Sequence, residues 1–328
     1  MNKQTVLNVH ITSRCDLFCR HCYNGKRKVT DVTVTQFAYI VNKAKEYLGA
    51  RIDRINLLGG EPTLHPDFCE ILSFAQQNAD VVGISTNGAK IVCFANKLRH
   101  NDIVQVSIET LNEPLADWYR GTHYYSRFMG CISELKQQGI DPTVKLLIDR
   151  NTTPYIAESL VKLLNIGVDR VAFNRIVTVG NAADIDVDLT SNELKKVYDL
   201  LLGFMVRKGL LIHVSDGLWY TYLSMRLGLS YNSSCSALSN SNITIVENGD
   251  VYLCRRLDMV VGNIFCDDIS TMLKHNPTYK KLIERNFVGV CGECDKKSFC
   301  GGCRACVKAK TGDVFESDSL CFLKENDK

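Results

Sequence analysis

The chain has 328 residues, 45% hydrophobic and 23% charged, as expected for a globular protein with one large core or two. Its net charge of +3 is too small to indicate nucleic-acid binding, and no apolar run approaches the ~18 residues that span a bilayer. The N-terminal segment lacks the apolar stretch of a secretion signal. Fifteen cysteines in such a chain indicate metal ligation rather than disulfides, so we expect a cytoplasmic protein without a membrane partner.

Strand-like and helix-like stretches alternate over the first two thirds of the chain, which indicates parallel βα units. The expected strands are 6–11, 54–59, 81–86, 102–107, 143–148 and 170–176. The expected helices are 34–48, 68–77, 128–138, 156–164 and 194–207, and cap-forming residues at 190–193 predict a helix start. Six units favour an α/β fold, a partial (β/α)6 TIM-like barrel, while the pattern alone leaves a doubly wound open sheet as the alternative.

The character of the sequence changes after Gly228. Residues 229–234 form a polar connection, and Cys235 begins a cysteine-rich tail, so we expect one domain over 1–228 and a second over 229–328. Within the tail, 243–246 and 251–253 are apolar and flank Asn248-Gly249. This pattern predicts a β-hairpin with a type I′ turn, whose positive φ angles Asn and Gly tolerate.

Three cysteines directly follow the first expected strand, with the spacing Cys15-x3-Cys19-x2-Cys22. Iron–sulfur clusters normally take four thiolates, so three would leave one iron open for a reactant. A zinc knuckle or a group of buried thiols is the alternative, although the x3 gap is unusual for zinc. The triad resembles the signature of radical S-adenosylmethionine (radical SAM) enzymes. The resemblance implies a catalytic [4Fe–4S] cluster that binds S-adenosylmethionine, and a 5′-deoxyadenosyl radical that abstracts hydrogen from the substrate.

A second motif, Gly59-Gly60-Glu61-Pro62, follows the second expected strand. Two glycines allow the backbone to approach a ligand closely, and Glu61 supplies a carboxylate for a cation. The motif resembles the GGEP element of the family, which holds the amino group of the methionine moiety. The resemblance therefore implies that Glu61 pairs with the methionine ammonium.

Further cofactor-binding positions follow the later strands. Ser85-x-Asn87-Gly88 and the segment Ser107-Ile-Glu109-Thr110 resemble elements that reach the ribose and the methionine carboxylate, with Glu109 in place of the usual Asp. Arg120-Gly121 matches a common Arg-Gly pair, and Arg120 is expected either to pair bidentately with a carboxylate or to lie on a helix surface. Tyr23 matches the aromatic position whose backbone lies near adenine in the family, so the resemblance implies that it borders the cofactor. Asn151 and 180–182 match positions at the barrel mouth, whereas His21 and His65 are interpreted as incidental.

The tail cysteines form a second dense pattern, with Cys235, Cys254, Cys291-x2-Cys294-x5-Cys300-x2-Cys303-x2-Cys306 and Cys321. They resemble a SPASM domain, which carries two auxiliary [4Fe–4S] clusters, and the chain would then hold three clusters. The resemblance implies a distal cluster on Cys291, Cys294, Cys300 and Cys321. It implies a proximal cluster on Cys235, Cys254 and Cys303, with Cys306, a substrate atom or nothing as fourth ligand. Structural zinc is the alternative, and Cys69, Cys93, Cys131 and Cys266 are expected to be inert thiols.

The leading functional hypothesis is a radical SAM/SPASM enzyme that matures a ribosomally made peptide by crosslinking, epimerisation or oxidation. The chain begins a few residues before its first strand, so we expect a separate leader-recognition protein, a short substrate or a small-molecule substrate. A flavodoxin- or ferredoxin-type reductant is expected. The enzyme alternative is an epimerase or dehydrogenase of an aminoglycoside-like sugar or a tetrapyrrole. The non-enzyme alternative is an iron–sulfur electron carrier or a zinc scaffold.

Overall fold

The computed structural model describes residues 4–25, 28–228 and 235–323. In this part of the chain one ten-stranded sheet has the order β10-β9-β8-β1-β2-β3-β4-β5-β6-β7. The strands are β1 (Val6–Thr12), β2 (Ile52–Gly59), β3 (Ala79–Thr86), β4 (Ile103–Ser107), β5 (Thr143–Ile148), β6 (Arg170–Arg175), β7 (Leu211–Val214), β8 (Asn242–Ile245), β9 (Asp250–Tyr252) and β10 (Val260–Asn263).

Helices of the described residues connect these strands. They are α1 (Val34–Leu48), α2 (Phe68–Asn78), α3 (Glu113–Arg120), α4 (Tyr124–Gln137), α5 (Ile156–Asn165), α6 (Ser191–Lys208), α7 (Gly217–Leu227), α8 (Ile269–His275), α9 (Pro277–Ile283), α10 (Gly289–Gly292) and α11 (Arg304–Thr311). The expected start of α6 is confirmed, because the Thr190 side chain accepts from Glu193 N and the Glu193 carboxylate accepts from Thr190 N. None of the helices in the described ranges has the length and apolar character needed to cross a membrane.

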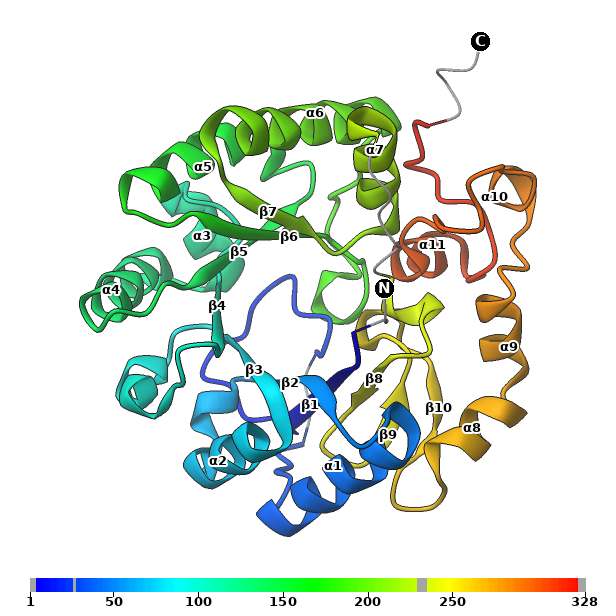
Figure 1. Cartoon of the computed structure of the whole chain (residues 1–328). Helices are drawn as coiled ribbons and strands as arrows, with labels where there is room; N and C mark the ends of the chain where they lie inside the picture. The colour runs from blue at the N-terminus through cyan, green and yellow to red at the C-terminus, as the bar shows by residue number, and fades with distance from the viewer. Residues whose placement is uncertain (1–3, 26–27, 229–234, 324–328) are drawn as a thin grey trace.

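The expected partial barrel is confirmed. Strands β1 to β7 are parallel and lie in the sheet in chain order, whereas a doubly wound sheet reverses its order at a switch point. Figure 1 shows these strands curved around the segment that follows β1, with helices on the outside. Within the described ranges, strands β7 and β10 end the sheet without pairing to one another, so the barrel is open.

The structure adds elements that the periodicity did not predict. Strand β7 has four residues and alternates exposed and buried positions, and α3 has eight residues, so each is too short to give a clear periodic signal. Helix α7 is apolar on most sides, because it packs between the barrel and the tail with Trp219 fully buried. A helix that is buried all round shows no amphipathic pattern.

The cysteine-rich tail continues the barrel sheet. The predicted hairpin of β8 and β9 is present, and β8 pairs in parallel with β1, from Val6 opposite Asn242 to Val9 opposite Ile245. The two expected domains therefore share one sheet, and the expected polar connection 229–234 lies outside the described residues. The type I′ turn is wrong. Gly249 N donates to Val246 O, which makes 247 and 248 the central residues, and only Gly249 has a positive φ, of 88°.

The two faces of the barrel strands differ in polarity. On β1, Leu7, Val9 and Ile11 are fully buried against α1 and its neighbours, while the alternating side chains point inward. Inside, Asn56 Nδ2 donates to Asn8 Oδ1 at 2.8 Å, and Asn8 Nδ2 donates to Asn242 Oδ1 at 2.7 Å. This asparagine chain spans β2, β1 and β8, so the tail is joined to the barrel through polar contacts in the interior.

Candidate active site

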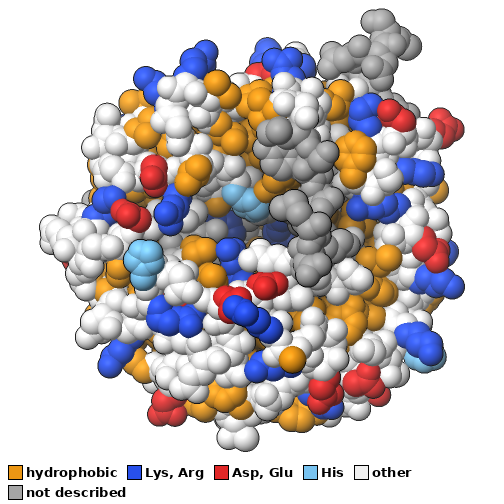
Figure 2. Space-filling view, viewed as in Figure 1, with side chains coloured by type: hydrophobic (Ala, Val, Ile, Leu, Met, Phe, Trp, Pro, Cys, Tyr) orange, Lys and Arg blue, Asp and Glu red, His pale blue; other side chains and the backbone are white. Residues whose placement is uncertain are grey.

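A cavity of about 300 Å³ opens where the barrel strands end. Figure 2 shows this central hollow, with Lys, Arg and His side chains on its floor. Its walls come from the loop after β1, from the ends of β2 to β6 and from the tail. The lining includes Cys15, Cys19, Cys22, Tyr23, Gly59, Gly60, Ser85, Asn87, Ser107, Glu109, Arg120, Lys145, Asn174, Arg175 and Arg256. The C-terminal ends of parallel barrel strands are where enzymes of this architecture place their chemistry.

The three triad cysteines open into this one cavity. Cys15 is exposed, Cys22 is half-buried, and Cys19 is 9% exposed. Asn181 holds the loop from the end of β6, because its backbone N donates to Cys22 O and its side chain donates to Cys19 O, both at 2.9 Å. The expected barrel-mouth position of Asn181 is thus a brace for the cysteine loop. Three thiols free of disulfides and facing one space are a donor set suited to an iron–sulfur cluster.

The two glycines of the second motif are required by the chain itself. A Cβ on Gly59, whose φ is 154°, would lie 2.2 Å from Thr12 O, and a Cβ on Gly60 would lie 2.3 Å from Arg14 O. The motif therefore packs directly against the backbone that leads into the cysteine loop. Both glycines still line the cavity, so their backbone is accessible to a ligand.

Glu61 was expected to contact a ligand directly, but it does not line the cavity. It is fully buried and outside the cavity wall, as is Pro62. Its Oε1 accepts from Thr63 N at 3.1 Å, Thr63 Oγ1 at 2.5 Å and Thr86 Oγ1 at 2.7 Å, while its Oε2 accepts from Asn87 N at 2.6 Å. Burial raises the pKa of this carboxyl group, and the four donors oppose the shift. Glu61 thus joins the loop after β2 to the end of β3.

Asn87 belongs to a polar cluster at the cavity edge. Its Nδ2 donates to Asp16 Oδ1 at 2.9 Å and lies 3.8 Å from Cys15 Sγ. Arg127 forms an ion pair with Asp16 at 2.6 Å and also donates to Asn87. Nearby, Ser85 Oγ accepts from Gln105. The cluster fixes the loop between the first two cysteines against α4.

Arg120 is the last residue of α3, but it is 8% exposed and not a surface residue. The expected bidentate pair is present within the protein, because Nε and Nη2 each lie 2.7 Å from a carboxylate oxygen of Glu109. His21 Nε2 lies 3.0 Å from the same carboxylate. Burial opposes ionisation of Glu109, but Arg120 and His21 hold the pKa of this carboxyl below its usual range. His21 is therefore part of the site, which its place between Cys19 and Cys22 could have signalled.

We did not predict the cationic side chains that β5 and the tail contribute to the cavity wall. Lys145 on β5 and Arg256 on the tail both line the cavity, and Lys145 Nζ donates to the Asn174 amide oxygen at 3.0 Å. The sequence signal was present, since Lys145 interrupts the apolar strand T-V-K-L-L-I at an inward position. The other expected mouth residue, Asn151, contacts Tyr119 and does not line the cavity.

The tail cysteines lie in two groups, which correspond to the two ligand sets that the family resemblance implies. Cys291, Cys294, Cys300 and Cys321 line one small cavity with Leu218 and Phe287. In the other group, desolvation and the neighbouring thiols of Cys303 and Cys254 raise the pKa of Cys235 to about 12. The described residues contain no three His, Cys, Asp or Glu side chains converging as a mononuclear metal site would need. Four thiols around one cavity are a donor set suited to a [4Fe–4S] cluster.

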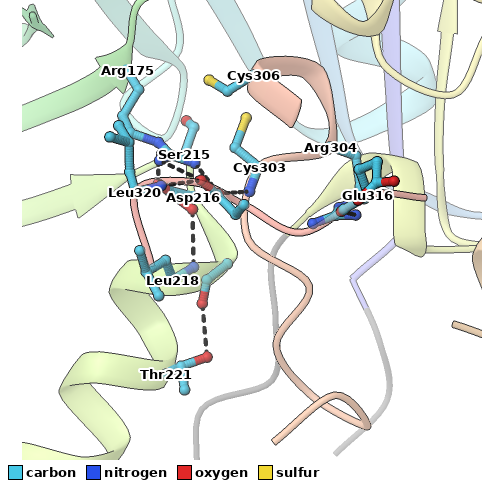
Figure 3. A network of polar contacts seen from close by, with 12 residues as sticks. Arg175, Ser215, Asp216, Leu218, Thr221, Cys303, Arg304, Cys306, Glu316 and Leu320 are labelled. Atoms are coloured by element: carbon cyan, nitrogen blue, oxygen red, sulfur yellow. Dashed lines mark hydrogen bonds and ion pairs between the residues drawn. The ribbon is translucent and has the colours of Figure 1, made fainter. Parts of the chain in front are cut away.

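Cys303 and Cys306 lie at the start of α11 with their thiols close together (Figure 3). A hydrogen bond between them lowers the pKa of Cys303 and raises that of Cys306. Cys306 Sγ also lies 3.4 Å from Ile176 O, at the end of β6. Cys306 therefore lies against the end of β6, and its thiol is close to that of Cys303.

A buried ion-pair network holds this part of the tail to the barrel. Arg175 on β6 lies 2.6 Å from an oxygen of Asp216, and its guanidinium donates to Asp318 at 2.5 and 3.2 Å. Asp318 also accepts from Cys303 N at 3.0 Å. Arg175 is thus the link between the barrel strand and the cysteine loop, and its position depends on two carboxylates from distant parts of the chain.

Residues 9–149 match the family model of the radical SAM superfamily. The chain is similar to the mycofactocin maturase MftC of Mycolicibacterium smegmatis, with 26% identity covering 91% of this chain and 78% of that protein. It is also similar to an AdoMet-dependent heme synthase of Oleidesulfovibrio alaskensis, with 23% identity covering 97% and 87%. The solved structure of Streptococcus suis SuiB bound to precursor peptide SuiA has the same fold, with a TM-score of 0.77, 18% identity and coverage of 98% and 76%.

Proposed function

This chain is a radical SAM enzyme, and we propose that Cys15, Cys19 and Cys22 hold the [4Fe–4S] cluster at which S-adenosylmethionine is cleaved. The observation that carries the proposal is that these three thiols open into one cavity beside the two glycines that end β2. When bound, the cluster and S-adenosylmethionine supply reductive carbon–sulfur cleavage and hydrogen abstraction from an unactivated carbon. An electron carrier or zinc scaffold has no use for such a cavity.

The remaining residues of the cavity divide into contacting and supporting ones. Tyr23, Gly59, Gly60, Ser85, Asn87 and Ser107 line the cavity on the cysteine side, and we assign them to S-adenosylmethionine binding. Glu61 and Pro62 support the loop behind them. Arg120 supports the wall by fixing Glu109 and His21, and these buried charges orient the cysteine loop rather than a ligand.

We further propose that the tail, residues 229–328, is a SPASM domain with two auxiliary [4Fe–4S] clusters. The cavity lined by Cys291, Cys294, Cys300 and Cys321 supports the distal one. The closeness of Cys303 to Cys235, Cys254 and Cys306 supports the proximal one, with Cys306 as the fourth ligand. Because Arg175 and Asp318 hold Cys303 at the barrel mouth, the proximal cluster would lie beside the substrate space.

The substrate favoured by the comparisons is a ribosomally made peptide. MftC is a maturase, and SuiB was solved with a precursor peptide. The reductant would be a small flavodoxin or ferredoxin, and a separate protein would recognise a leader peptide. A cytoplasmic location stays a prediction. Tetrapyrrole modification is the second candidate, because heme synthases match 97% of the chain.

Anaerobic reconstitution with iron and sulfide tests the proposal. The wild-type protein should bind about twelve irons, as three cubanes of four, and should produce 5′-deoxyadenosine with a reductant. Replacing Cys15, Cys19 and Cys22 with alanine should remove about a third of the iron and all 5′-deoxyadenosine. A matched control replaces the exposed Cys69, Cys93 and Cys266, which lie outside both cysteine-lined cavities, and should lose neither. Cleavage retained in the first variant would refute the assignment.

A further inference from the structure

Two cations of the cavity lack the carboxylate partner that its other cations have. Arg120 is paired with Glu109, and Arg175 with Asp216 and Asp318. In contrast, Lys145 and Arg256 form no ion pair with any carboxylate of the described residues. Charges held out of bulk water are normally paired, because desolvation of an uncompensated ion is costly. The unpaired state of these two groups therefore indicates that a ligand supplies the missing charge.

The hydrogen bonds of both groups leave donors free. Arg256 donates only to two backbone oxygens, Arg175 O at 3.4 Å and Ser215 O at 3.3 Å, both long contacts. Lys145 has one neutral partner, the Asn174 amide oxygen, while its ammonium group offers three donors. Both side chains border the cavity, so the free donors are accessible from it.

The surroundings make this wall electropositive. Burial, Arg256 and Arg120 lower the pKa of Lys145 to about 8, and Glu109 opposes the shift only weakly because its charge is shared with Arg120 and His21. The same positive charges act on His213 of β7. Burial and the charges of Lys145, Arg54 and Arg256 lower its pKa to about 4. Glu109 is already paired with Arg120 and His21, so an anion placed beside Lys145 and Arg256 would meet two cations that no carboxylate of the described residues pairs.

We propose that Lys145, with Arg256 beside it, binds a carboxylate of the substrate. The proposal rests on the proposed function, in which the cysteine side of the cavity, at the ends of β1 to β4, holds the cofactor. Lys145 on β5 is paired in register with Ser107 on β4, so it stands at the border of that side, and Asn174 lies on the next strand, β6. A substrate that presents a free carboxylate to this wall would extend from it toward the cofactor. The substrate class is thus a carboxylic acid, such as a peptide with a free C-terminus or an acidic side chain.

Arg256 has a second possible charge partner, because it lies two residues after Cys254 and close to Cys303. A cluster bound to those thiolates would partly neutralise the positive charge of Arg256. Lys145 has no such neighbour and is the residue on which the test depends. Lys145→Gln removes the charge, and Lys145→Arg restores it. The matched control is Lys162→Gln on α5, an exposed lysine paired with Glu158.

The probes are N-acetylglycylglycine and its carboxamide, which differ only in the charge of the terminus. Binding to the reconstituted enzyme is measured by saturation-transfer NMR with S-adenosylmethionine present, at about pH 7. We expect the acid to bind about tenfold more tightly than the amide, as for one charge-assisted contact. The preference should persist in Lys162→Gln, disappear in Lys145→Gln and return in Lys145→Arg. In the wild type it should fall as pH rises through about 8, because Lys145 then loses its proton.

Equal binding of acid and amide by the wild type, or a preference that survives in Lys145→Gln, would overturn the proposal. A Lys145→Gln variant that also loses affinity for S-adenosylmethionine would overturn it too, since Lys145 would then serve the cofactor carboxylate. The proposed function fails separately, if the wild type keeps the acid preference but forms no 5′-deoxyadenosine.

Discussion

Replacing Glu61 with glutamine tests whether this residue supports the fold or contacts the cofactor. Each of its carboxylate oxygens accepts a backbone N–H, Oε1 from Thr63 and Oε2 from Asn87. Glutamine has one oxygen and one NH₂ group, so in either orientation the NH₂ group faces one of these N–H donors. The hydroxyls of Thr63 and Thr86 can rotate to accept, but a backbone N–H cannot.

The loss of stability follows from the one backbone N–H that glutamine leaves without an acceptor. One buried backbone donor left without an acceptor costs about 1–3 kcal/mol, and the loss of charge-assisted bonds adds to it. We therefore expect Glu61→Gln to lower the free energy of unfolding of the metal-free protein by about 2 kcal/mol. The assay is urea unfolding followed by circular dichroism, with Glu158→Gln as the control. Glu158 is exposed and paired with Lys162, so its replacement should change stability by less than about 0.5 kcal/mol.

A ligand-contacting role and a structural role of Glu61 predict different changes in cofactor affinity and in stability. If Glu61 contacted the methionine ammonium, Glu61→Gln would weaken S-adenosylmethionine binding and leave the metal-free protein as stable as the wild type. If it joins the loops after β2 and β3, stability falls first and affinity falls as a consequence. Unchanged unfolding together with a tenfold rise in the dissociation constant would refute the reasoning from the hydrogen bonds.

Three further predictions concern the buried charges and the tail. Arg175→Met should cost about 3–5 kcal/mol in a thermal or urea unfolding assay, because it leaves Asp216 and Asp318 buried without a counter-charge, whereas Arg150→Met at an exposed pair should be nearly neutral. Ionised Glu109 stabilises the fold above the usual Glu pKa, and this contribution is lost as pH falls below that value. The difference in unfolding free energy between wild type and Glu109→Gln should therefore shrink from about pH 5 to pH 2. A difference that stays constant would contradict the pairing with Arg120. Cys306→Ala should lower the iron content and alter the auxiliary electron paramagnetic resonance signal while 5′-deoxyadenosine still forms, and unaltered spectra would show that Cys306 is no ligand.

The sequence alone predicted the parts of this protein that depend on local pattern. Helix α1 has the predicted bounds, and the capping residues at Thr190 and Glu193 act as predicted, because periodicity and capping involve residues a few positions apart. The cysteine spacings also carried information, since ligands of one cluster are often close in sequence. They separated the barrel cysteines from the tail cysteines, and the family resemblance that they carry implied the four that line a common cavity.

The tertiary structure decided which groups face one another. Glu61 and Arg120 were expected to meet a ligand, but each is saturated by partners from other loops, Glu61 by Thr86 and Asn87 and Arg120 by Glu109. Lys145 belongs to no sequence motif, and its importance comes from a position in the cavity where no carboxylate of the described residues pairs with it. A side chain's partners are set by which strands lie adjacent and which way each residue points. Residue type and spacing indicate which chemistry a side chain is capable of. The free energy of ionising that side chain depends on the groups that surround it after folding.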